Sequence, residues 1–294
     1  MKEITVISGK GGTGKTSLSA ALAALMGKRA VVTDCDVDAA NMHILMKPVV
    51  HDEQPFKSGS EAVINPEACT RCGKCKKVCR FDAISIVNQA YTVDSIACEG
   101  CGYCANICPA NAIVMEPIVA GTLFRSTSQY QNSFVHARLG IAADNSGKLV
   151  TEVRNRAKKL AQDTGVDYLL HDGAPGVGCP VTASVTGADY ILMIAEPSVS
   201  GSHDVKRVYE LVKQFSIPAG MIINKQGLNP EIEQELEHFC AEKKIDFIGT
   251  LPYSSDFSKA INANQTIVEY SPVLKEKMEH IFAHLKQKIE TISA

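Results

Sequence analysis

Short apolar runs alternate with amphipathic stretches near the N-terminus, and this pattern predicts a parallel α/β sheet. Residues 4–8 and 30–34 are apolar and rich in β-branched side chains, which is typical of buried strands. Residues 16–27, between them, are rich in Ala and Leu and end at a glycine, which predicts a helix. Strand, loop, helix and strand in this order open a mostly parallel sheet flanked by helices.

The same alternation resumes in the C-terminal half of the chain. It predicts helices at 149–164, 201–215 and 230–243, and strands at 166–171, 189–195, 219–224 and 245–251. Apolar residues from 274 to 292 recur at helical spacing, which predicts a last helix. Its mixture of Lys and Glu, with Phe282 as the one aromatic residue, favours packing over binding to a membrane surface.

The middle of the chain follows a different pattern. Residues 47–60 are polar and interrupted by Pro and Gly, which predicts a linker. Residues 61–117 are rich in cysteine, and two β-rich runs within 118–140 predict a hairpin. We therefore expect a discontinuous α/β domain, 1–60 and 118–294, interrupted by an inserted module at 61–117.

Charge and hydropathy narrow the classes of partner. The 294 residues carry a net charge of −2, whereas nucleic-acid binders usually show a strong basic excess, so no nucleic-acid partner is expected. No apolar run is long enough to span a bilayer, and the N-terminus lacks the apolar core of a signal peptide. These features predict a cytoplasmic protein without a membrane partner.

A phosphate-binding loop follows the first predicted strand. Residues 9–16 read G-K-G-G-T-G-K-T, which fits G-x-x-x-x-G-K-[ST] between a strand and a helix, a context that disfavours a chance glycine turn. We expect Lys15 to reach the β- and γ-phosphates of ATP and the Thr16 hydroxyl to ligate Mg²⁺. The candidate nucleotide ligands are Gly11, Gly12, Thr13, Gly14, Lys15, Thr16 and Ser17.

The form K-G-G-x-G-K-T resembles the deviant Walker A loop of the MinD/ParA/nitrogenase iron-protein ATPases. In that family the earlier lysine crosses a dimer interface and contacts the nucleotide of the other subunit. The resemblance therefore implies a homodimer, or a dimer with a paralogous subunit, in which Lys10 and Lys15 are catalytic. The alternative is that Lys10 is a solvated lysine beside the loop.

Two carboxylates extend this resemblance. Asp36 matches the family aspartate that positions the attacking water near Mg²⁺, with Asp38 as a weaker candidate that a turn-capping role would also explain. Asp172 ends a predicted strand and matches the Walker B ligand of Mg²⁺, and 172–178 resembles the D-x-x-P-G-x-G switch II. Asn224 and Pro252, each after a predicted strand, are the candidates for the adenine pocket.

Cysteines supply a second set of candidate ligands. Eight of the eleven fall between residues 69 and 108, which in a cytosolic chain indicates metal or cluster ligation rather than disulfides. Residues 69–80 and 98–109 each read C-x₂-C-x₂-C-x₃-C, an internal repeat 29 residues apart. This is the spacing of two-cluster bacterial ferredoxins, in which the fourth cysteine ligates the other cluster. The expected [4Fe-4S] ligands are Cys69, Cys72, Cys75 and Cys108 for one cluster, and Cys98, Cys101, Cys104 and Cys79 for the other.

Alternatives for the cysteines remain open. Zinc also favours four-cysteine sites, although its motifs rarely repeat such runs. Arg80 stands where proline usually follows the fourth cysteine. Small buried thiols are the default interpretation for the other three cysteines, even though Cys179 follows the predicted switch II as a cluster-bridging cysteine does in the nitrogenase iron protein. They are Cys35, Cys179 and Cys240.

Charge is uneven between the two cysteine runs. Residues 61–88 carry five Arg or Lys against three acids, whereas residues 89–117 carry three acids and no Arg or Lys. Local positive charge raises a cluster's potential, so the Cys69 cluster is predicted to be the easier to reduce. The basic face is a candidate docking site for an acidic redox partner, with a solvated patch as the alternative.

Two functions are compatible with these motifs. In the first, ATP-driven dimerisation and switching are coupled to electron transfer through two [4Fe-4S] clusters, to or from an unidentified redox or iron–sulfur partner. In the second, the ATPase is an iron–sulfur scaffold, a carrier or a MinD-like positioning switch without net redox catalysis. Cluster carriers related to Mrp use a C-x-x-C pair near the C-terminus, and no such pair follows residue 108, which favours the first function.

Overall fold

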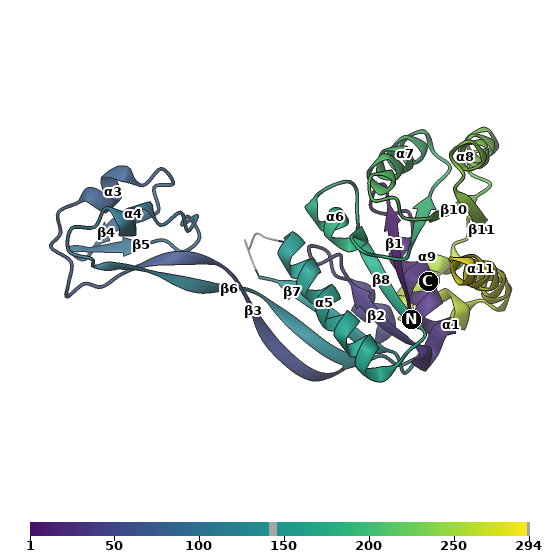
Figure 1. Cartoon of the computed structure of the whole chain (residues 1–294), viewed down its shortest axis with the longest axis horizontal. Helices are drawn as coiled ribbons and strands as arrows, with labels where there is room; N and C mark the ends of the chain where they lie inside the picture. Colours follow the sequence, from purple (N-terminus) through teal and green to yellow (C-terminus); the bar gives the residue numbers. More distant parts are fainter. Residues whose placement is uncertain (141–145, 293–294) are drawn as a thin grey trace. The chain divides into compact units, whose positions relative to one another are not determined.

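The computed structural model describes residues 1–140 and 146–292, and the backbone separates into two compact units (Figure 1). The larger unit comprises Met1–Gln54, Leu123–Arg138 and the chain from Ser146 onward. The smaller unit is built mainly from Pro55–Thr122 and contains the eight clustered cysteines. The cysteine-rich segment is thus compact in its own right.

Across the described residues, nine strands form one mostly parallel sheet, as the sequence predicts. Their order is β11 (Asp246–Pro252), β10 (Ala219–Gln226), β9 (Tyr190–Ala195), β1 (Lys2–Ser8), β8 (Tyr168–Pro175), β2 (Ala30–Asp34), β7 (Ser133–Leu139), β6 (Ile113–Thr127) and β3 (Val49–Ile64). Each neighbouring pair from β11 to β7 is parallel. Because parallel strands end at one edge of a sheet, the loops after β1, β8 and β2 meet there.

The central strands are buried on both faces, and their side chains alternate between two cores. In β9, Tyr190, Leu192 and Ile194 pack into one core, whereas Ile191 and Met193 pack into the other. Such two-sided burial gives a parallel strand its continuous apolar sequence. The first core is completed by helices α1 (Lys15–Met26), α2 (Met42–Met46), α9 (Asp256–Asn262), α10 (Ile267–Tyr270) and α11 (Pro272–Thr291).

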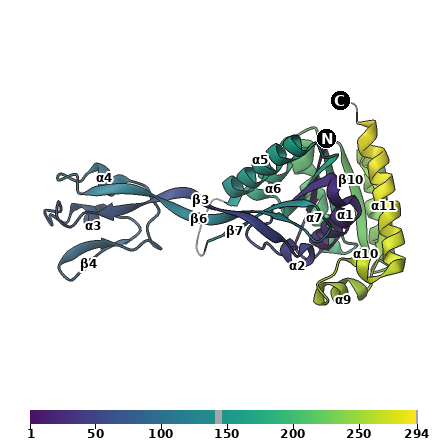
Figure 2. The same ribbon diagram turned by 90° about the horizontal axis from the view of Figure 1, so that it is seen from below.

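The second core is covered by a different set of helices, α6 (Cys179–Val185), α7 (Val199–Lys213) and α8 (Pro230–Lys243), and α5 (Ser146–Thr164) packs on α6. Figure 2 shows α11 along one side of the larger unit, with α9 and α10 near its first turn. Its packing against β11 and α1 agrees with the packing helix predicted from residues 274–292. In the described ranges, no helix is both long and apolar enough to cross a membrane.

One sequence prediction is wrong: residues 47–60 are not a linker, because Val49–Ile64 is strand β3. This strand stands last in the order of the sheet, and most of its first ten residues are exposed. An edge strand tolerates proline and polar residues because one side of its backbone needs no partner strand. The predicted hairpin at 118–140 corresponds to β6 and β7, which are neighbours in the sheet.

The smaller unit carries two short helices, α3 (Lys74–Val78) and α4 (Tyr103–Asn106), and an antiparallel pair, β4 (Ile84–Val87) and β5 (Ala90–Val93). Asn88 and Gln89 join the two strands with φ values of 48° and 61°. Positive φ at both central residues is the requirement of a type I′ turn, whose twist matches that of the strands.

The 29-residue repeat recurs in the backbone hydrogen bonds of this unit. The N–H of Asn65 donates to the carbonyl of Ala112 over 2.8 Å, and the N–H of Asp94 donates to the carbonyl of Ala83 over 2.7 Å. Each donor and each acceptor lies 29 positions from its counterpart, so each repeat supplies one donor and one acceptor to the other. The positive φ angles repeat at the same interval, at Arg71 and Gly100, Gly73 and Gly102, and Asp82 and Asn111.

Candidate functional site

The phosphate loop connects β1 to α1 at the edge where the parallel strands end. Gly12 and Gly14 have φ values of 80° and 94°, which residues with a side chain rarely adopt. A Cβ added at Gly11 would meet nothing within 4 Å, so this part of the loop faces open space. The N-terminus of α1 follows directly at Lys15, and its free N–H groups favour a bound anion.

Asp172 binds polar side chains of α1 from within β8, which continues to Pro175 and does not end at residue 172 as the sequence predicts. Its Oδ1 lies 2.8 Å from the Lys15 ammonium, and its Oδ2 accepts a 2.7 Å hydrogen bond from the Thr16 hydroxyl. Ser19, which the sequence does not single out, donates to Oδ1 over 2.7 Å. Burial lowers the pKa of Lys15, but the carboxylate of Asp172 more than offsets this, so the pKa lies above its usual value. The predicted phosphate lysine and two predicted Mg²⁺ ligands therefore meet at one point.

Two further carboxylates lie near Asp172: Asp34, the last residue of β2 and the register partner of Asp172, and Asp36, two positions later. Asp34 is fully buried and accepts hydrogen bonds from the backbone N–H groups of Asp36 and Met42, each over 3.1 Å. Burial, reinforced by the Asp172 carboxylate, raises the pKa of Asp34 to about 7. Asp36 is half-buried, and burial raises its pKa. Asp38 is exposed.

Lys10 is held by residues of its own chain. Its ammonium lies 2.8 Å from Oε1 of Glu196 and donates to the Ser200 hydroxyl over 2.9 Å. The other carboxylate oxygen of Glu196 pairs with Lys225, which donates to the carbonyl of Gly12 over 2.8 Å. Burial opposes ionisation of Glu196, but the hydrogen bonds from the two lysines outweigh it and lower the pKa to about 2.

Glu196 is a site residue that sequence reasoning missed, although a signal was present. It follows the apolar strand predicted at 189–195, as Asp34 and Asp172 follow theirs. A polar residue at the carboxyl end of a parallel strand beside the phosphate loop is a candidate by the rule that selects those aspartates.

Asn224 lies two residues before the end of β10, and Pro252 is the last residue of β11. The Asn224 amide donates to the carbonyl of Thr13 over 2.7 Å, which brings this residue to the phosphate loop. Within the described residues, Asn224 Oδ1 and Thr13 Oγ1 are buried without a hydrogen-bond partner. Pro252 is the register partner of Gln226, and the following Tyr253 is 65% exposed. These two ends are thus neighbours at the same edge of the sheet.

A buried polar network lies next to the site, and no sequence pattern predicts it. Nδ1 and Nε2 of His171 lie 2.7 Å from the Thr33 hydroxyl and 3.1 Å from Glu3. Burial lowers the pKa of His171 to about 4. Arg154, on α5, pairs with Glu3 and donates to the carbonyls of Ala183 and Thr186 at the end of α6. The network therefore ties α5 to the helix that follows residues 172–178.

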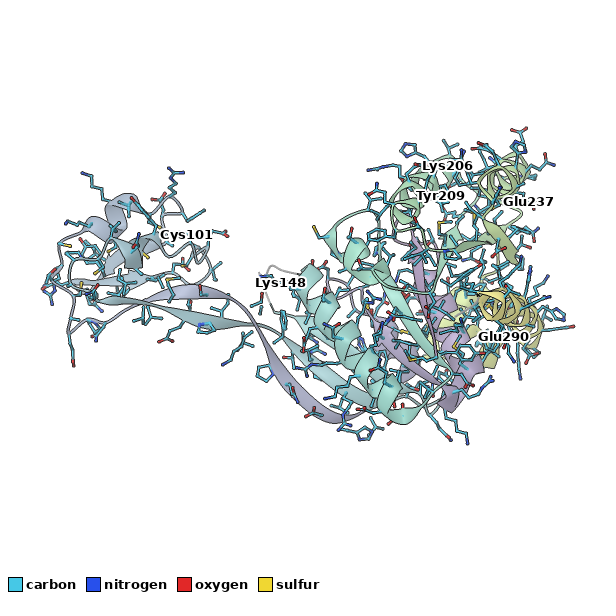
Figure 3. The ribbon with its side chains drawn as sticks, viewed as in Figure 1. Cys101, Lys148, Lys206, Tyr209, Glu237 and Glu290 are labelled. Carbon is cyan, nitrogen blue, oxygen red and sulfur yellow. The ribbon has the colours of Figure 1, made fainter. Side chains whose placement is uncertain are left out.

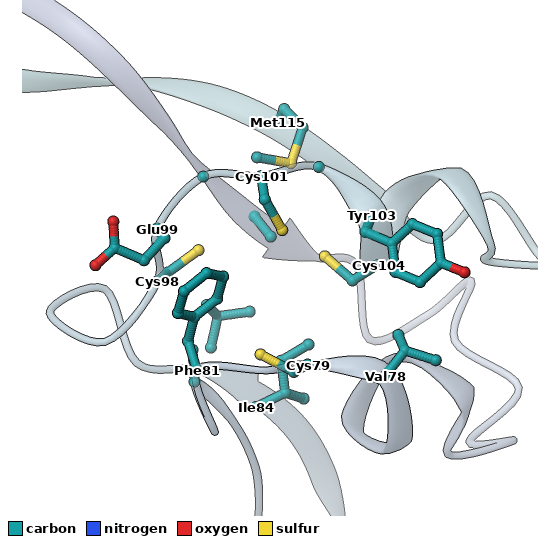
Figure 4. Close-up of a pocket in the computed structure, with 15 residues that line it drawn as sticks. Val78, Cys79, Phe81, Ile84, Cys98, Glu99, Cys101, Tyr103, Cys104 and Met115 are labelled. Carbon is teal, nitrogen blue, oxygen red and sulfur yellow. The ribbon is translucent and has the colours of Figure 1, made fainter.

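The eight clustered cysteines line two separate cavities of the smaller unit. One is lined by Cys79, Cys98, Cys101 and Cys104, whose sulfur atoms point into a common space (Figure 4). The other is lined by Cys69, Cys72, Cys75 and Cys108. Apolar side chains such as Phe81, Ile84 and Met115 complete the first cavity. These two sets contain the same cysteines as the two sets of ligands expected from the repeat.

The cysteines differ in exposure. Cys72 and Cys101 are exposed, and Cys101 is labelled at the surface of the smaller unit in Figure 3. Cys35 and Cys240 are buried, and burial raises the pKa of each thiol to about 12, as expected for inert thiols. Cys179 is exposed at the first position of α6, so the default interpretation of a buried thiol is wrong for this residue.

Comparison with known proteins identifies the family. The model of the CobQ/CobB/MinD/ParA nucleotide binding domain matches residues 4–267. An uncharacterised protein of Methanocaldococcus jannaschii is 33% identical over 98% of this chain and 97% of its own length. An uncharacterised ATP-binding protein of the same organism is 49% identical over 87% of this chain and 76% of its own. The septum site-determining protein MinD of Pyrococcus horikoshii, solved with Mg-ADP, shares the fold with a TM-score of 0.59 at 17% identity, covering 99% of this chain and 98% of that one. The chain therefore belongs to the CobQ/CobB/MinD/ParA family of nucleotide-binding domains.

Proposed function

We propose that the protein is an ATP hydrolase in which ATP-driven dimerisation is coupled to electron transfer through two [4Fe-4S] clusters. One observation carries this proposal: a single chain combines the phosphate loop of its family with eight cysteines that line two cavities in sets of four. Residues 1–60 and 118–294 would form the ATPase, and residues 61–117 the cluster module.

The nucleotide role is supported by the polar groups around the phosphate loop. Lys15, Thr16 and Asp172 meet within hydrogen-bonding distance, where Lys15 would bind the phosphates and the other two would hold Mg²⁺ with Asp36. The unpartnered buried oxygens of Thr13 and Asn224, within the described residues, fit a ligand that donates hydrogen bonds beside the loop. Asn224 and Pro252 are accordingly proposed to contact the base.

Lys10 would act on the nucleotide of the second subunit, as the family resemblance implies. A cation brought to the transferring phosphoryl group stabilises the charge that develops there. Because Lys10 is paired with Glu196 in its own chain, closure of the dimer would require it to exchange this carboxylate for the partner's nucleotide. Hydrolysis is therefore expected to depend on dimerisation.

The cluster role is supported by how the repeats share cysteines. Each cavity takes three cysteines from one run and the fourth cysteine of the other run, the pattern of two-cluster ferredoxins. In the described ranges, no three His, Cys, Asp or Glu side chains are placed to hold a single metal ion. Zinc, which also favours four-cysteine sites, is the alternative that metal analysis of the purified protein would distinguish. When bound, each cluster would supply one-electron redox chemistry.

A second candidate is a MinD-like positioning switch or an iron–sulfur carrier without net redox catalysis. The similarity to the MinD of P. horikoshii over 99% of the chain favours it. In this case the clusters would be cargo or structural elements, and nucleotide would leave their potentials unchanged.

Anaerobic potentiometry and stopped-flow oxidation, each with and without Mg-ATP, test the proposal. Coupling predicts that Mg-ATP shifts a cluster potential or changes the rate of transfer to an acceptor, and that Lys10→Ala abolishes this effect. Unchanged potentials and rates, together with ATP-dependent transfer of iron and sulfide to an apo acceptor, would support the carrier instead. A colourless protein containing zinc would contradict both.

A further inference from the structure

The two halves of the smaller unit share a backbone pattern but differ sharply in surface charge. The first half carries five basic residues in and around α3, which we call the basic surface: Arg71, Lys74, Lys76, Lys77 and Arg80. The positions 29 residues later, in and around α4, are all uncharged: Gly100, Tyr103, Ala105, Asn106 and Pro109. Since the same backbone accepts neutral residues, folding alone does not require these charges.

The basic surface is exposed and has no counter-charge of its own. All five side chains belong to exposed residues, and within the described part of the chain none of them forms an ion pair. By contrast, Lys206 and Lys288 of the larger unit pair with carboxylates at their surface positions. A cluster of like charges without partners creates a local positive potential that attracts acidic molecules.

This potential surrounds the most accessible corner of one cysteine cavity. Cys72 is exposed, whereas the other three cysteines of its set are half-buried. Arg71 precedes Cys72 directly, and Lys74 lines the cavity beside it. A partner held by the basic surface would therefore lie next to the most exposed cysteine of this set.

We propose that the basic surface docks an acidic protein electron carrier, which exchanges electrons with the cluster of the Cys69 set. This inference rests on the proposed function. In the forward direction the reduced carrier loses one electron and the oxidised cluster gains it, with no bond made and no proton moved. Because the surface around α4 is neutral, the cluster of the Cys98 set would exchange electrons with a different partner. Electrons would then enter the unit at one cluster and leave it at the other.

The size of the basic surface favours a protein carrier over a nucleic acid. The five charges lie within ten residues of sequence, on one five-residue helix and its flanking loops. Duplex binding normally uses a longer basic stripe and a basic chain, whereas this chain has a net charge of −2. Transient redox complexes, in contrast, use small interfaces that charge complementarity steers.

The test exchanges two charges for their counterparts in the other repeat. Lys76→Ala and Lys77→Asn place in α3 the residues that α4 carries at the equivalent positions, and they leave Arg71 and Lys74 beside the cavity. The matched control, Lys275→Ala with Lys277→Asn, removes two exposed lysines from α11 in the larger unit. The probe is an acidic [2Fe-2S] ferredoxin, used with each protein in its iron-loaded form.

Binding of the oxidised ferredoxin at low salt is expected to weaken about tenfold in the α3 variant and to lose much of its salt dependence, and electron transfer from the reduced ferredoxin should slow similarly. The control should be unchanged, and the reaction with reduced methyl viologen, a small cationic donor that the basic surface does not attract, should not slow in the α3 variant. Equal ferredoxin binding by wild type and α3 variant, with both clusters present, would overturn this inference alone. The inference would also be overturned if the substitutions in α3 weakened binding to duplex DNA as strongly as binding to the ferredoxin, because the surface would then bind polyanions in general. Absence of clusters from the wild type would instead remove the proposed function.

Discussion

The ammonium of Lys10 lies 2.8 Å from the carboxylate of Glu196 within the same chain. The second carboxylate oxygen of Glu196 pairs with Lys225, which also donates to the carbonyl of Gly12. Glu196 therefore bridges Lys10, in the phosphate loop, and Lys225, in β10. If Lys10 acts on the nucleotide of a second subunit, this contact competes with dimerisation. The balance between the two partners of Lys10 would set how readily ATP closes the dimer.

Glu196→Gln is therefore expected to tighten the ATP-dependent dimer. The amide keeps the shape of the side chain but removes the charge that holds Lys10, and a partly exposed ion pair contributes up to about 1 kcal/mol, or roughly fivefold in affinity. Analytical ultracentrifugation with a slowly hydrolysed ATP analogue measures the change. Glu235→Gln, which removes the partner of Lys206 on the surface, is the control and should have no effect. A weaker dimer in Glu196→Gln would contradict the competition.

Lys10→Ala is expected to bind ATP normally but to lose hydrolysis. A cation contributed in trans typically accelerates phosphoryl transfer by about 10³-fold or more, whereas nucleotide binding within one subunit depends on Lys15. Fluorescent nucleotide titration and phosphate release separate these two effects. If Lys10→Ala hydrolysed ATP at the wild-type rate, Lys10 would be the solvated lysine of the alternative interpretation.

Asp172→Asn is expected to destabilise the larger unit as well as to weaken Mg²⁺-dependent binding. Lys15 is 5% exposed, and removing the counter-charge of a buried pair costs about 3–5 kcal/mol. The double variant Lys15→Met with Asp172→Asn should recover much of this loss, because it removes the buried Lys15 charge that Asp172→Asn leaves without its partner. Urea unfolding without nucleotide measures it. Ser19→Ala, which removes one hydrogen bond to Asp172, should cost only about 1 kcal/mol. A double variant no more stable than Asp172→Asn would exclude this explanation.

Cys79→Ala is expected to remove the cluster of the Cys98 set although it belongs to the first cysteine run. Iron content should fall from about eight to about four atoms per chain, because the cavity lined by Cys98, Cys101 and Cys104 loses its fourth thiol. Electron paramagnetic resonance of the reduced protein would then show one cluster without coupling to a second. Cys240→Ala, at a buried thiol of the larger unit, should retain both clusters. Loss of the Cys69-set cluster instead would refute the exchange of ligands.

His136→Phe is expected to make the larger unit less sensitive to mild acid. The ring of His136 stacks on Phe124 and Phe134, and burial lowers its pKa to about 4. Between pH 6.5 and 4 the unfolded chain binds a proton that the folded chain does not, so stability falls as the pH drops through this window. The loss is about 2 kcal/mol for a group that remains partly solvated. Urea midpoints from pH 7 to 4.5 should fall less steeply in His136→Phe than in wild type.

Much of the larger unit could be predicted because its buried strands carry unbroken apolar runs. Strands such as β2 and β9, buried on both faces, match the predicted ranges within one residue. Likewise, Lys15 and Thr16 follow from a loop motif whose backbone context is short-range, and Asp172 follows from its place after a predicted apolar strand. The parallel order of the sheet then brings their side chains together.

The features that could not be predicted from the sequence are of two kinds: contacts between residues far apart in the chain, and a strand whose residues are mostly exposed. β3 was not predicted because much of this strand has no buried face, and its sequence therefore lacks the alternation of apolar and polar residues that indicates a strand. In the sequence Ser19 is an ordinary helix residue, and only the folded chain shows that its hydroxyl donates to Oδ1 of Asp172 over 2.7 Å. Similarly, Glu3 and Arg154 are separated by 151 positions, so only the folded chain shows that they pair.

The reciprocal bonds between Asn65 and Ala112 and between Asp94 and Ala83 mean that neither half of the smaller unit completes its own backbone. Each half needs the other half as the partner for these backbone hydrogen bonds. The tight turn at Asn88 and Gln89 keeps the two halves at a high effective concentration relative to each other, which separate peptides would not have. Cleavage at that turn would be expected to leave a nicked but associated pair, whereas a chain carrying one half alone would have no complement and no route to either cavity.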